Sequence, residues 1–570
     1  MSVVDESGGG DDPNEVVLDG ESLTPEQVVA VARERAEVTV SDDAREAVRR
    51  SRERIEDVVE SGEAVYGVNT GFGELVDERI PAEEIDALQT NLVRSHAAGA
   101  GSELPIEAVR AMMTCRINAL VKGYSGIRET VVDHLVAMVN EGVHPVVKSR
   151  GSLGASGDLA PLAHMSLVLL GEGEADVGTR GSGSESGGPE RLPGDEALER
   201  VGLDPLTLRA KEGLALINGT QLTVGLASLL VVDAERLVST ADVAGALSTE
   251  VTMGSTVPSH PAITDVRPHE GQAQSAANVR TLTADSDVVE SHRNCDRVQD
   301  AYSFRCLPQV HGAVRDAVAH LRAAVETELN SVTDNPLVFP REAEGSEASE
   351  RASGEERPAS REAGEGTRFD DRASGTDTAA VLSGGNFHGE VLALRLDYLT
   401  SALTELAAIS ERRVDRMLNP NLQEPHLPPF LTPESGLMSG YMIAQYTAAA
   451  MLNECRSLGQ PSTDNTPVSG NQEDHVSMSN QSAYHARTAL ANVQTVVGIE
   501  LICGAQAAEF VDDDLDLGAG TGAAYDAVRE VVPELTEDRP VHDDIERGEA
   551  VVRTEKFGRR VAAALDGPLQ

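Results

Sequence analysis

Long amphipathic repeats dominate the second half of the chain. In one stretch, leucines recur at steps of four and three residues, at Leu392, Leu396, Leu399, Leu403 and Leu406. The same spacing returns nearer the C-terminus, at Leu490, Val493, Val497 and Leu501. Because an α-helix turns once every 3.6 residues, this spacing places the apolar side chains on one stripe. The pattern predicts two long helices here and comparable ones over about 219–250, 309–332 and 436–457.

The first half alternates shorter helical patterns with glycine-rich loops. Helical spacing of apolar residues runs over 24–60, 85–97, 106–141 and 159–170. Between these runs, Tyr66–Gly73 and Ser149–Asp158 are too rich in glycine to continue a helix, so both are interpreted as ordered loops. Alternating strand patterns are few. We therefore predict an all-α fold, with an N-terminal, mostly helical region followed by a bundle of long helices.

Composition suggests where the chain divides. Residues 1–20 are expected to form a flexible leader, 21–215 an N-terminal domain, 216–510 the central helix bundle and 511–570 a C-terminal helical segment. Two stretches, 171–193 and 341–378, are rich in glycine, serine and charged residues and poor in apolar ones. Neither buries enough surface to repay the entropy of ordering, so both are predicted to be mobile insertions.

The charge balance excludes some classes of partner. The chain carries 94 acidic residues against 47 Lys and Arg, a formal net charge of −47. Only four of the basic residues are lysines, at positions 122, 148, 211 and 556. Nucleic-acid binding needs a basic surface and is not expected. A lysine-poor, acidic surface is typical of proteins adapted to high salt, although an ordinary acidic protein is the alternative.

The spacing of cysteines, histidines and apolar residues indicates in which compartment the protein works and whether it binds a metal or a membrane. Five cysteines are scattered without a CxxC pair, which favours reduced thiols over a disulfide framework or a zinc site. The 14 histidines are not spaced as metal-ligand pairs. The acidic N-terminus does not resemble a signal peptide, and no uninterrupted apolar run reaches membrane-spanning length. We expect a cytoplasmic protein that binds neither a metal nor a membrane.

Candidate chemistry lies in the second glycine-rich loop, Gly151–His164, which reads GSLGASGDLAPLAH. A tight turn before a helix, with Asp158 as the cap, is the plain structural interpretation. The loop lacks the GxSxG spacing of a nucleophile elbow, and the chain has no phosphate loop ending in Gly-Lys-Ser/Thr.

Small side chains in this loop permit an unusual reaction. The unhindered nitrogen of Gly157 can approach the carbonyl of Ala155 in a sharply bent backbone. Ring closure with loss of water, then loss of the Ser156 hydroxyl as a second water, would give 4-methylideneimidazol-5-one. Such a group is an electrophile, which the ordinary side chains do not offer and which cofactors usually supply.

Several motifs together resemble one family. They are Tyr66–Gly73, Asn91–His96, Gly151–His164, Asn218–Gln221, Gln299–Cys306, Ser331–Pro336, Ser383–His388, Glu454 and Asn471–Met478. In this order, over about residues 40–510, they resemble the ammonia-lyases and aminomutases of aromatic amino acids, which build 4-methylideneimidazol-5-one from their own chain. The resemblance implies a bundle of the fumarase type and a homotetramer whose sites draw on three chains.

The resemblance also implies roles for single residues in removing ammonia and a neighbouring hydrogen. Ser156 becomes the 2,3-didehydroalanine of the group, and Ala155 and Gly157 are cross-linked as its ring partners. Tyr66 takes the β-proton, although a loop anchor is the simpler interpretation of that residue. Tyr302 handles protons on the leaving amine. Whether the amine or the ring of the substrate adds to the electrophile stays open.

Other matched residues are expected to bind the substrate. By the same resemblance, Arg305 clamps its carboxylate through two parallel hydrogen bonds, although many surface arginines look alike in sequence. Asn218 and Gln299 are matched to polar positions around the substrate, and Phe387 to the pocket wall, with core packing as its alternative.

Substrate choice depends on two residues. His96 and Glu454 match positions that face the ring of the substrate, where a carboxylate suits a protonatable ring better than benzene. We therefore expect conversion of L-histidine to trans-urocanate and ammonia, the first step of histidine breakdown. A lyase or aminomutase acting on phenylalanine or tyrosine, or an inactive helical scaffold, is the alternative. Ala301, His311 and Gly389 depart from the family's pattern beside these positions.

Overall fold

The computed structural model describes residues 14–61, 65, 67–68, 70, 80–178, 188–293, 297–339, 381–463, 465–565, 567 and 569–570. The chain divides into two compact units, each assembled from three stretches of sequence. The first unit takes residues up to Leu226, residues 326–389 and residues 465–477, and the second takes the rest. The contiguous blocks 21–215, 216–510 and 511–570 do not coincide with these units, because segments distant in sequence pack together.

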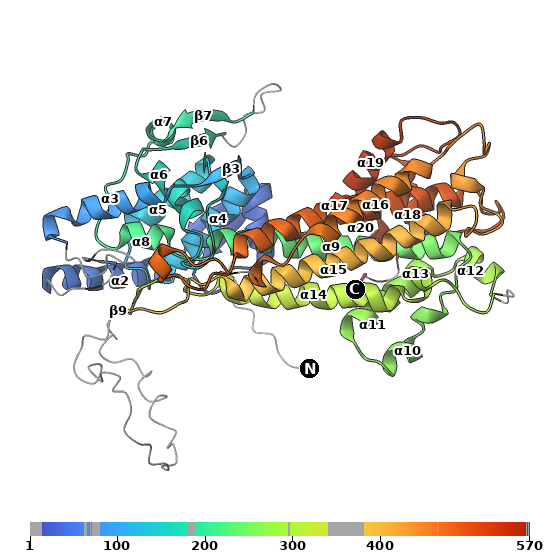
Figure 1. The fold of residues 1–570 in the computed structure, drawn as a ribbon, viewed down its shortest axis with the longest axis horizontal. Helices are drawn as coiled ribbons and strands as arrows, with labels where there is room; N and C mark the ends of the chain where they lie inside the picture. Colours follow the sequence, from blue (N-terminus) through green and yellow to red (C-terminus); the bar gives the residue numbers. More distant parts are fainter. Residues whose placement is uncertain are drawn as a thin grey trace, which may run out of the picture. The chain divides into compact units, whose positions relative to one another are not determined.

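The first unit combines short helices with four small sheets (Figure 1). Its strands are β1 (Glu15–Leu18), β2 (Glu37–Val40), β3 (Ala100–Glu103), β4 (Val143–Pro145), β5 (Lys148–Arg150), β6 (Glu174–Val177), β7 (Glu190–Pro193), β8 (Leu337–Val338) and β9 (Val381–Leu382). Its helices are α1 (Pro25–Val29), α2 (Asp42–Ser61), α3 (Ile85–His96), α4 (Ile106–Val121), α5 (Glu129–Glu141), α6 (Leu159–Leu169), α7 (Gly194–Arg200) and α8 (Glu212–Ile217).

The strands β1 and β2 form a parallel pair near the N-terminus, and this pair corrects two expectations from the sequence. The leader 1–20 was expected to be flexible, yet β1 lies within it, pairs with β2 and buries Val16 and Leu18. The helical spacing over 24–60 is interrupted by β2. Arg35 has a φ of 60°, which ends the preceding helical turns, and the following Glu-Val-Thr-Val segment alternates with the two-residue period of a strand.

The expectation of a mobile insertion over 171–193 is wrong at both ends. β6 pairs with β4 on one side and with β7 on the other, forming a three-stranded antiparallel sheet. Ala175 and Val177 are buried, so alternate apolar residues in a glycine-rich stretch suffice to attach it to the unit. Residues 179–187 lie outside the described residues, as does the whole of the insertion 341–378.

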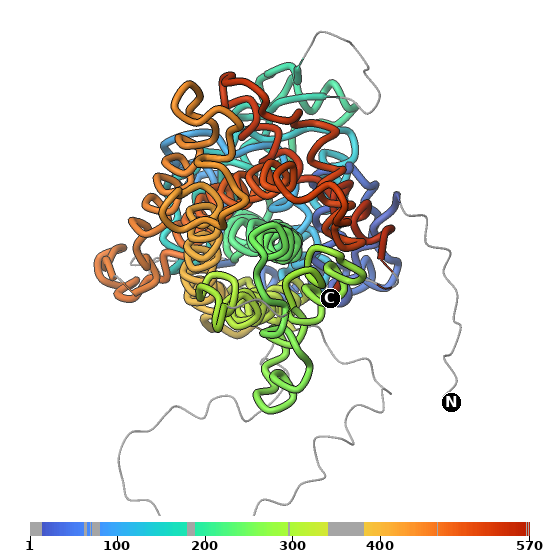
Figure 2. Tube along the Cα trace, turned by 90° about the vertical axis from the view of Figure 1, so that its right-hand side faces the viewer, coloured from blue at the N-terminus to red at the C-terminus, as the bar shows by residue number. Residues whose placement is uncertain are grey.

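The second unit is a bundle of long helices, as predicted. Two of its helices are shared with the first unit: α9 (Gln221–Val251) belongs to the bundle from Ala227 onward, and α14 (Leu307–Leu329) up to Val325. The other helices are α10 (Pro261–Asp265), α11 (Glu270–Leu282), α12 (Asp287–Ser291), α13 (Tyr302–Arg305), α15 (Glu390–Leu418), α16 (Met442–Ser457), α17 (Ser479–Ala508), α18 (Ala519–Arg529), α19 (Val541–Arg553) and α20 (Glu555–Ala563). α15 and α16 both pack along α17, and Figure 2 looks down these helices. The five leucines of the α15 repeat are fully buried, which confirms the stripe and the all-α class.

One helix of the bundle has the length and apolar composition of a membrane span. α17 meets that test, but 89% of its apolar stretch is buried inside the structure. A helix at the centre of a bundle is apolar on all sides for the same reason, since it has no face in solvent.

Candidate active site

The loop that carries Ala155, Ser156 and Gly157 is bent at two glycines between β5 and α6. Gly154 and Gly157 have φ angles of +71° and +79°, in the left-handed region that favours glycine. A β-carbon on Gly157 would lie 2.2 Å from the carbonyl oxygen of Gly219. Position 157 therefore admits only glycine while the two backbone segments stay this close.

Hydrogen bonds fasten both ends of the loop. The carbonyl of Gly154 accepts from the Ser477 hydroxyl at 3.0 Å and from the Gly389 amide at 3.0 Å. At the other end, the Asp158 amide donates to the Gly219 carbonyl at 2.6 Å. The buried Asp158 carboxylate accepts from the amide and hydroxyl of Thr223, at 2.8 and 3.0 Å. Asp158 thus binds the first turn of α9 and does not cap its own helix, α6.

Asn218 connects the loop to a pocket. Its Nδ2 donates to the carbonyl of Ser156 at 2.9 Å, while its buried Oδ1 has no hydrogen-bond partner among the described residues. The pocket encloses about 490 Å³, a size that suits a small-molecule ligand. Its lining includes the predicted residues Ala155, Ser156, Asn218 and Phe387, together with Leu214, Asn335, Ser383, Gly384, His388, Gln472, Glu473, Asp474 and His475.

Glu473 is the carboxylate that the structure places beside Ser156. The Ser156 hydroxyl donates to Glu473 Oε1 at 3.1 Å. Asn465 holds the segment that carries Glu473, since its side chain binds the Asp474 carbonyl at 2.6 Å and the Val476 amide at 2.9 Å. Sequence reasoning singled out the motif Asn471–Met478 but gave no role to Glu473; an acidic residue inside a matched motif was the available signal.

Two histidines of the pocket were also missed. His388 and His475 stack with ring centroids 5.8 Å apart and ring planes 7° from parallel. The His388 Nε2 lies 3.3 Å from the His475 carbonyl oxygen. Both belong to motifs quoted from the sequence, Ser383–His388 and Asn471–Met478, and give this pocket polar, protonatable walls.

Three further predicted residues form one group in the second unit. Tyr302 and Arg305 occupy the single turn of α13, where the Arg305 guanidinium lies 5.8 Å from the Tyr302 ring centroid. Arg305 donates to the side-chain oxygen of Gln299. Tyr302 is 71% exposed within this chain, so its ring is accessible to a ligand or to another protein.

The remaining predicted residues lie in other surroundings. Glu454 is exposed on α16 and accepts from Asn492 Nδ2 at 3.0 Å. His96 ends α3, where its Nδ1 lies 2.8 Å from the Leu92 carbonyl. Because a carbonyl oxygen can only accept, this contact favours a proton on Nδ1. Tyr66 lies outside the described residues.

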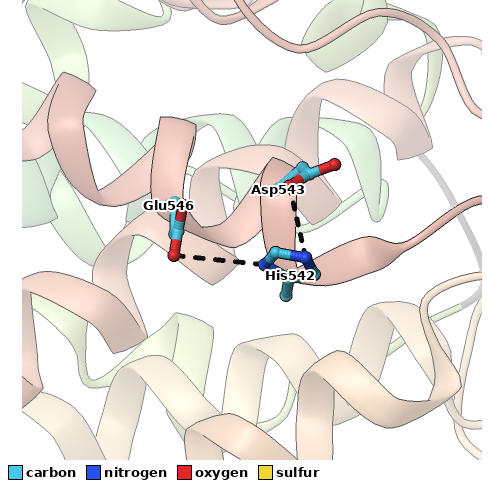
Figure 3. A group of neighbouring side chains, drawn as sticks. All are labelled: His542, Asp543 and Glu546. Atoms are coloured by element: carbon cyan, nitrogen blue, oxygen red, sulfur yellow. Dashed lines mark ion pairs between the residues drawn. The ribbon is translucent and has the colours of Figure 1, made fainter.

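A possible metal-ligand group occurs on α19. Among the described residues, His542, Asp543 and Glu546 of α19 place potential ligand atoms within 4.8 Å of one another (Figure 3). All three are exposed, and His542 lies 3.3 Å from Asp543 and 4.0 Å from Glu546, as side chains on one helical turn do. The described cysteines at 115, 306, 455 and 503 are free thiols.

Comparison with known proteins identifies the family. The aromatic amino acid lyase family matches residues 23–530. A probable histidine ammonia-lyase of Halobacterium salinarum is 63% identical over 97% of this chain and 99% of its own. Among solved structures, histidine ammonia-lyase from Trypanosoma cruzi (TM-score 0.82, covering 97% and 96% of the two chains) and tyrosine aminomutase from Streptomyces globisporus (0.84, covering 98% and 100%) are each 36% identical. The chain belongs to the aromatic amino acid lyase family.

Proposed function

We propose that the protein is a histidine ammonia-lyase, which converts L-histidine to trans-urocanate and ammonia. In this reaction the bond from Cα to nitrogen and one Cβ–H bond break, and a carbon–carbon double bond forms. The observation that carries the proposal is the carboxylate of Glu473, hydrogen-bonded to Ser156 in a pocket that also holds two imidazoles.

The loop residues fit the prosthetic group implied by the family resemblance. Gly157 has a φ of +79° and no side chain to hinder its nitrogen, and Ala155 and Ser156 line the pocket. We propose that Ala155, Ser156 and Gly157 form 4-methylideneimidazol-5-one, with Asn218 Nδ2 holding the carbonyl of Ser156. The group would supply an electrophile that withdraws electrons from the substrate. No metal is part of this proposal.

Polar groups of the pocket favour histidine over phenylalanine. Formation of the proposed group removes the Ser156 hydroxyl that donates to Glu473. A benzene ring placed here would then bury Glu473 without that partner, at a cost of roughly 1–3 kcal/mol for an unsatisfied polar group. An imidazole can donate to that carboxylate instead. The partnerless Oδ1 of Asn218 is an acceptor for the ammonium group of the amino acid. Glu473 is therefore a second candidate, beside Glu454, for the ring-facing role.

Other assignments stay proposals that depend on family resemblance. Tyr66 would accept the β-proton and Tyr302 would handle the proton on the amine. Arg305 would bind the substrate carboxylate, beside Gln299, and His96 would face the ring. The hydrogen bond between Arg305 and Gln299 supports the carboxylate clamp, because it orients the guanidinium.

We also propose that the active form is a homotetramer in the cytoplasm. Val391, Leu394 and Tyr398 follow one another on α15 at helical spacing, and each is about half exposed in the single chain. A row of apolar side chains on an exposed helix face is typical of a surface that another copy covers. Light scattering should give four chains, and Leu394→Glu should lower that number.

A substrate panel with mass spectrometry tests the enzyme assignment. We expect trans-urocanate from L-histidine by ultraviolet absorbance, and a tryptic peptide spanning Ser156 that is two waters lighter than its sequence. Ser156→Ala should fold, keep the unmodified peptide mass and lose nearly all turnover. Cinnamate or coumarate, or a β-amino acid as made by the similar tyrosine aminomutase, would contradict the choice of substrate and reaction.

A further inference from the structure

Behind the pocket, α4 carries a buried cation that the proposed chemistry has not used. Arg116 is fully buried, and its Nε and Nη2 atoms have no hydrogen-bond partner among the described residues. The Asp334 carboxylate attracts Arg116 electrostatically, but it is already paired with the Lys211 ammonium group at 2.9 Å. Burial lowers the pKa of Arg116 to about 10, opposed by Asp334, so the side chain is still charged at neutral pH.

An incompletely compensated buried charge is costly. Removing an ion from water costs several kcal/mol unless partners replace its hydration. Neighbouring Arg110 on the same helix shows the contrast, since its Nε donates to the Val31 carbonyl at 2.8 Å and its Nη1 to the Val139 carbonyl at 2.7 Å. Arg116 is therefore expected to lower the stability of the fold, and its contacts indicate which role it serves.

Both hydrogen bonds of Arg116 go to the segment that holds the Ser156 loop. Its Nη1 donates to the Asn218 carbonyl at 2.8 Å and to Gln221 Oε1 at 2.7 Å. Gly219 makes room for this guanidinium, because a β-carbon there would lie 2.8 Å from Nη1. The Asn218 side chain then donates to the carbonyl of Ser156 at 2.9 Å.

We propose that Arg116 is a positioning residue, which orients Asn218 and supplies positive potential at the Ser156 carbonyl while Ser156 loses water. In that elimination the Cα proton leaves, negative charge passes to the carbonyl oxygen, the Cβ–O bond breaks and a double bond forms between Cα and Cβ; proton and hydroxide depart as water. The donor at Asn218 and the cation behind it stabilise the oxygen as it gains charge. This inference rests on the proposed prosthetic group.

The test compares two buried arginines on one helix. Arg116→Lys and Arg110→Lys both shorten a buried cation on α4, but only the first loses the bridge to Asn218 and Gln221. After expression, we expect the Ser156 peptide of Arg116→Lys to be mostly unmodified or one water light, and that of Arg110→Lys to be two waters light. Turnover of Arg116→Lys should fall about a hundredfold relative to Arg110→Lys, the scale of loss that follows removal of one preorganised donor.

A second variant covers the case in which Arg116→Lys does not fold. Gln221→Glu places a carboxylate at the first residue of α9, where a helix N-terminus favours negative charge. The new carboxylate would lie beside the Arg116 guanidinium and compensate its positive charge. Its loop peptide should also retain water. Complete dehydration in both variants, or in the one that folds, would overturn the role of Arg116. If the wild-type peptide itself carries no modification, the prosthetic-group assignment fails instead.

Discussion

The assignment of one carboxylate decides which amino acid the pocket suits. Glu473 and Glu454 are both acidic residues of matched motifs, but they differ in surroundings. Glu473 is half-buried and bonded to Ser156, whereas Glu454 is exposed and bonded to Asn492. A charge close to the reacting loop interacts strongly with a substrate, because the low dielectric of a pocket screens it little.

We therefore predict that Glu473→Gln lowers kcat/KM for L-histidine by about a hundredfold, or roughly 2.7 kcal/mol at 25 °C. Glutamine keeps the size and one acceptor oxygen but removes the charge that we propose to pair with the imidazole of the substrate. Steady-state kinetics of Glu473→Gln and Glu454→Gln, measured side by side, provide the check. A larger loss in Glu454→Gln would return the ring-facing role to that residue.

At the scale of elements, the prosthetic loop depends on the close approach of two backbone segments. Gly157→Ala places a methyl group 2.2 Å from the Gly219 carbonyl and requires a φ of +79°, which costs about 1–2 kcal/mol outside glycine. We expect this variant to fold with a lower melting temperature and to keep the loop peptide at its unmodified mass. Gly188→Ala, whose new β-carbon meets no atom of the described residues within 4 Å, is the control and should match wild type in both measurements.

The buried polar network of the bundle predicts a pH dependence of stability. His311 lies 2.7 Å from Asp242 and 3.3 Å from the Arg413 guanidinium, while Arg315 binds the other Asp242 oxygen. Burial, aided by Arg413 and opposed by Asp242, lowers the pKa of His311. In the unfolded chain histidine keeps its ordinary pKa near 6.5, so below that pH only the unfolded state gains the proton. The contribution of neutral His311 to stability is thus fully present well above pH 6.5 and is lost as the pH falls through that value.

The corresponding variant is His311→Gln, which cannot take up a proton. Denaturant unfolding between pH 7.5 and 5 should show wild type losing up to about 1.4 kcal/mol per pH unit more than the variant, the contribution of one proton. Equal slopes for the two proteins would mean that His311 takes up its proton with the same pKa in the folded and the unfolded state.

The positions of the long helices were predictable because their buried apolar residues recur at a fixed spacing in the sequence. The contacts of the site have no such repeat. The Leu392–Leu406 stripe needed only the period of a helix. The strand β6 was missed because Ala175 and Val177 are isolated among glycines and acidic residues, and their burial depends on β4, about thirty residues earlier. Glu473 joins Ser156 from 317 positions away, a proximity that no local pattern contains.

For the whole molecule, the excess of negative charge sets the response to salt. Exposed ion pairs such as Arg49–Glu129, at 2.9 Å, contribute at most about 1 kcal/mol each and weaken when salt screens them. The protein also has a net charge of −47, so its carboxylates repel one another. The same salt screens this repulsion, which raises the stability of the folded state. Because acidic residues outnumber basic ones two to one, repulsion among carboxylates exceeds attraction to basic groups, and relief of repulsion should prevail.

We accordingly expect the melting temperature and the histidine turnover to rise as KCl increases from 0.1 to 2 M. Most of the rise should come below about 1 M, where the Debye length has already fallen from about 10 Å to about 3 Å. Sucrose at matched osmolality separates screening from a general effect of solute exclusion, and should give a smaller rise. A melting temperature that falls with KCl would mean that ion pairs dominate the electrostatic free energy and that the acidic surface is no adaptation to salt.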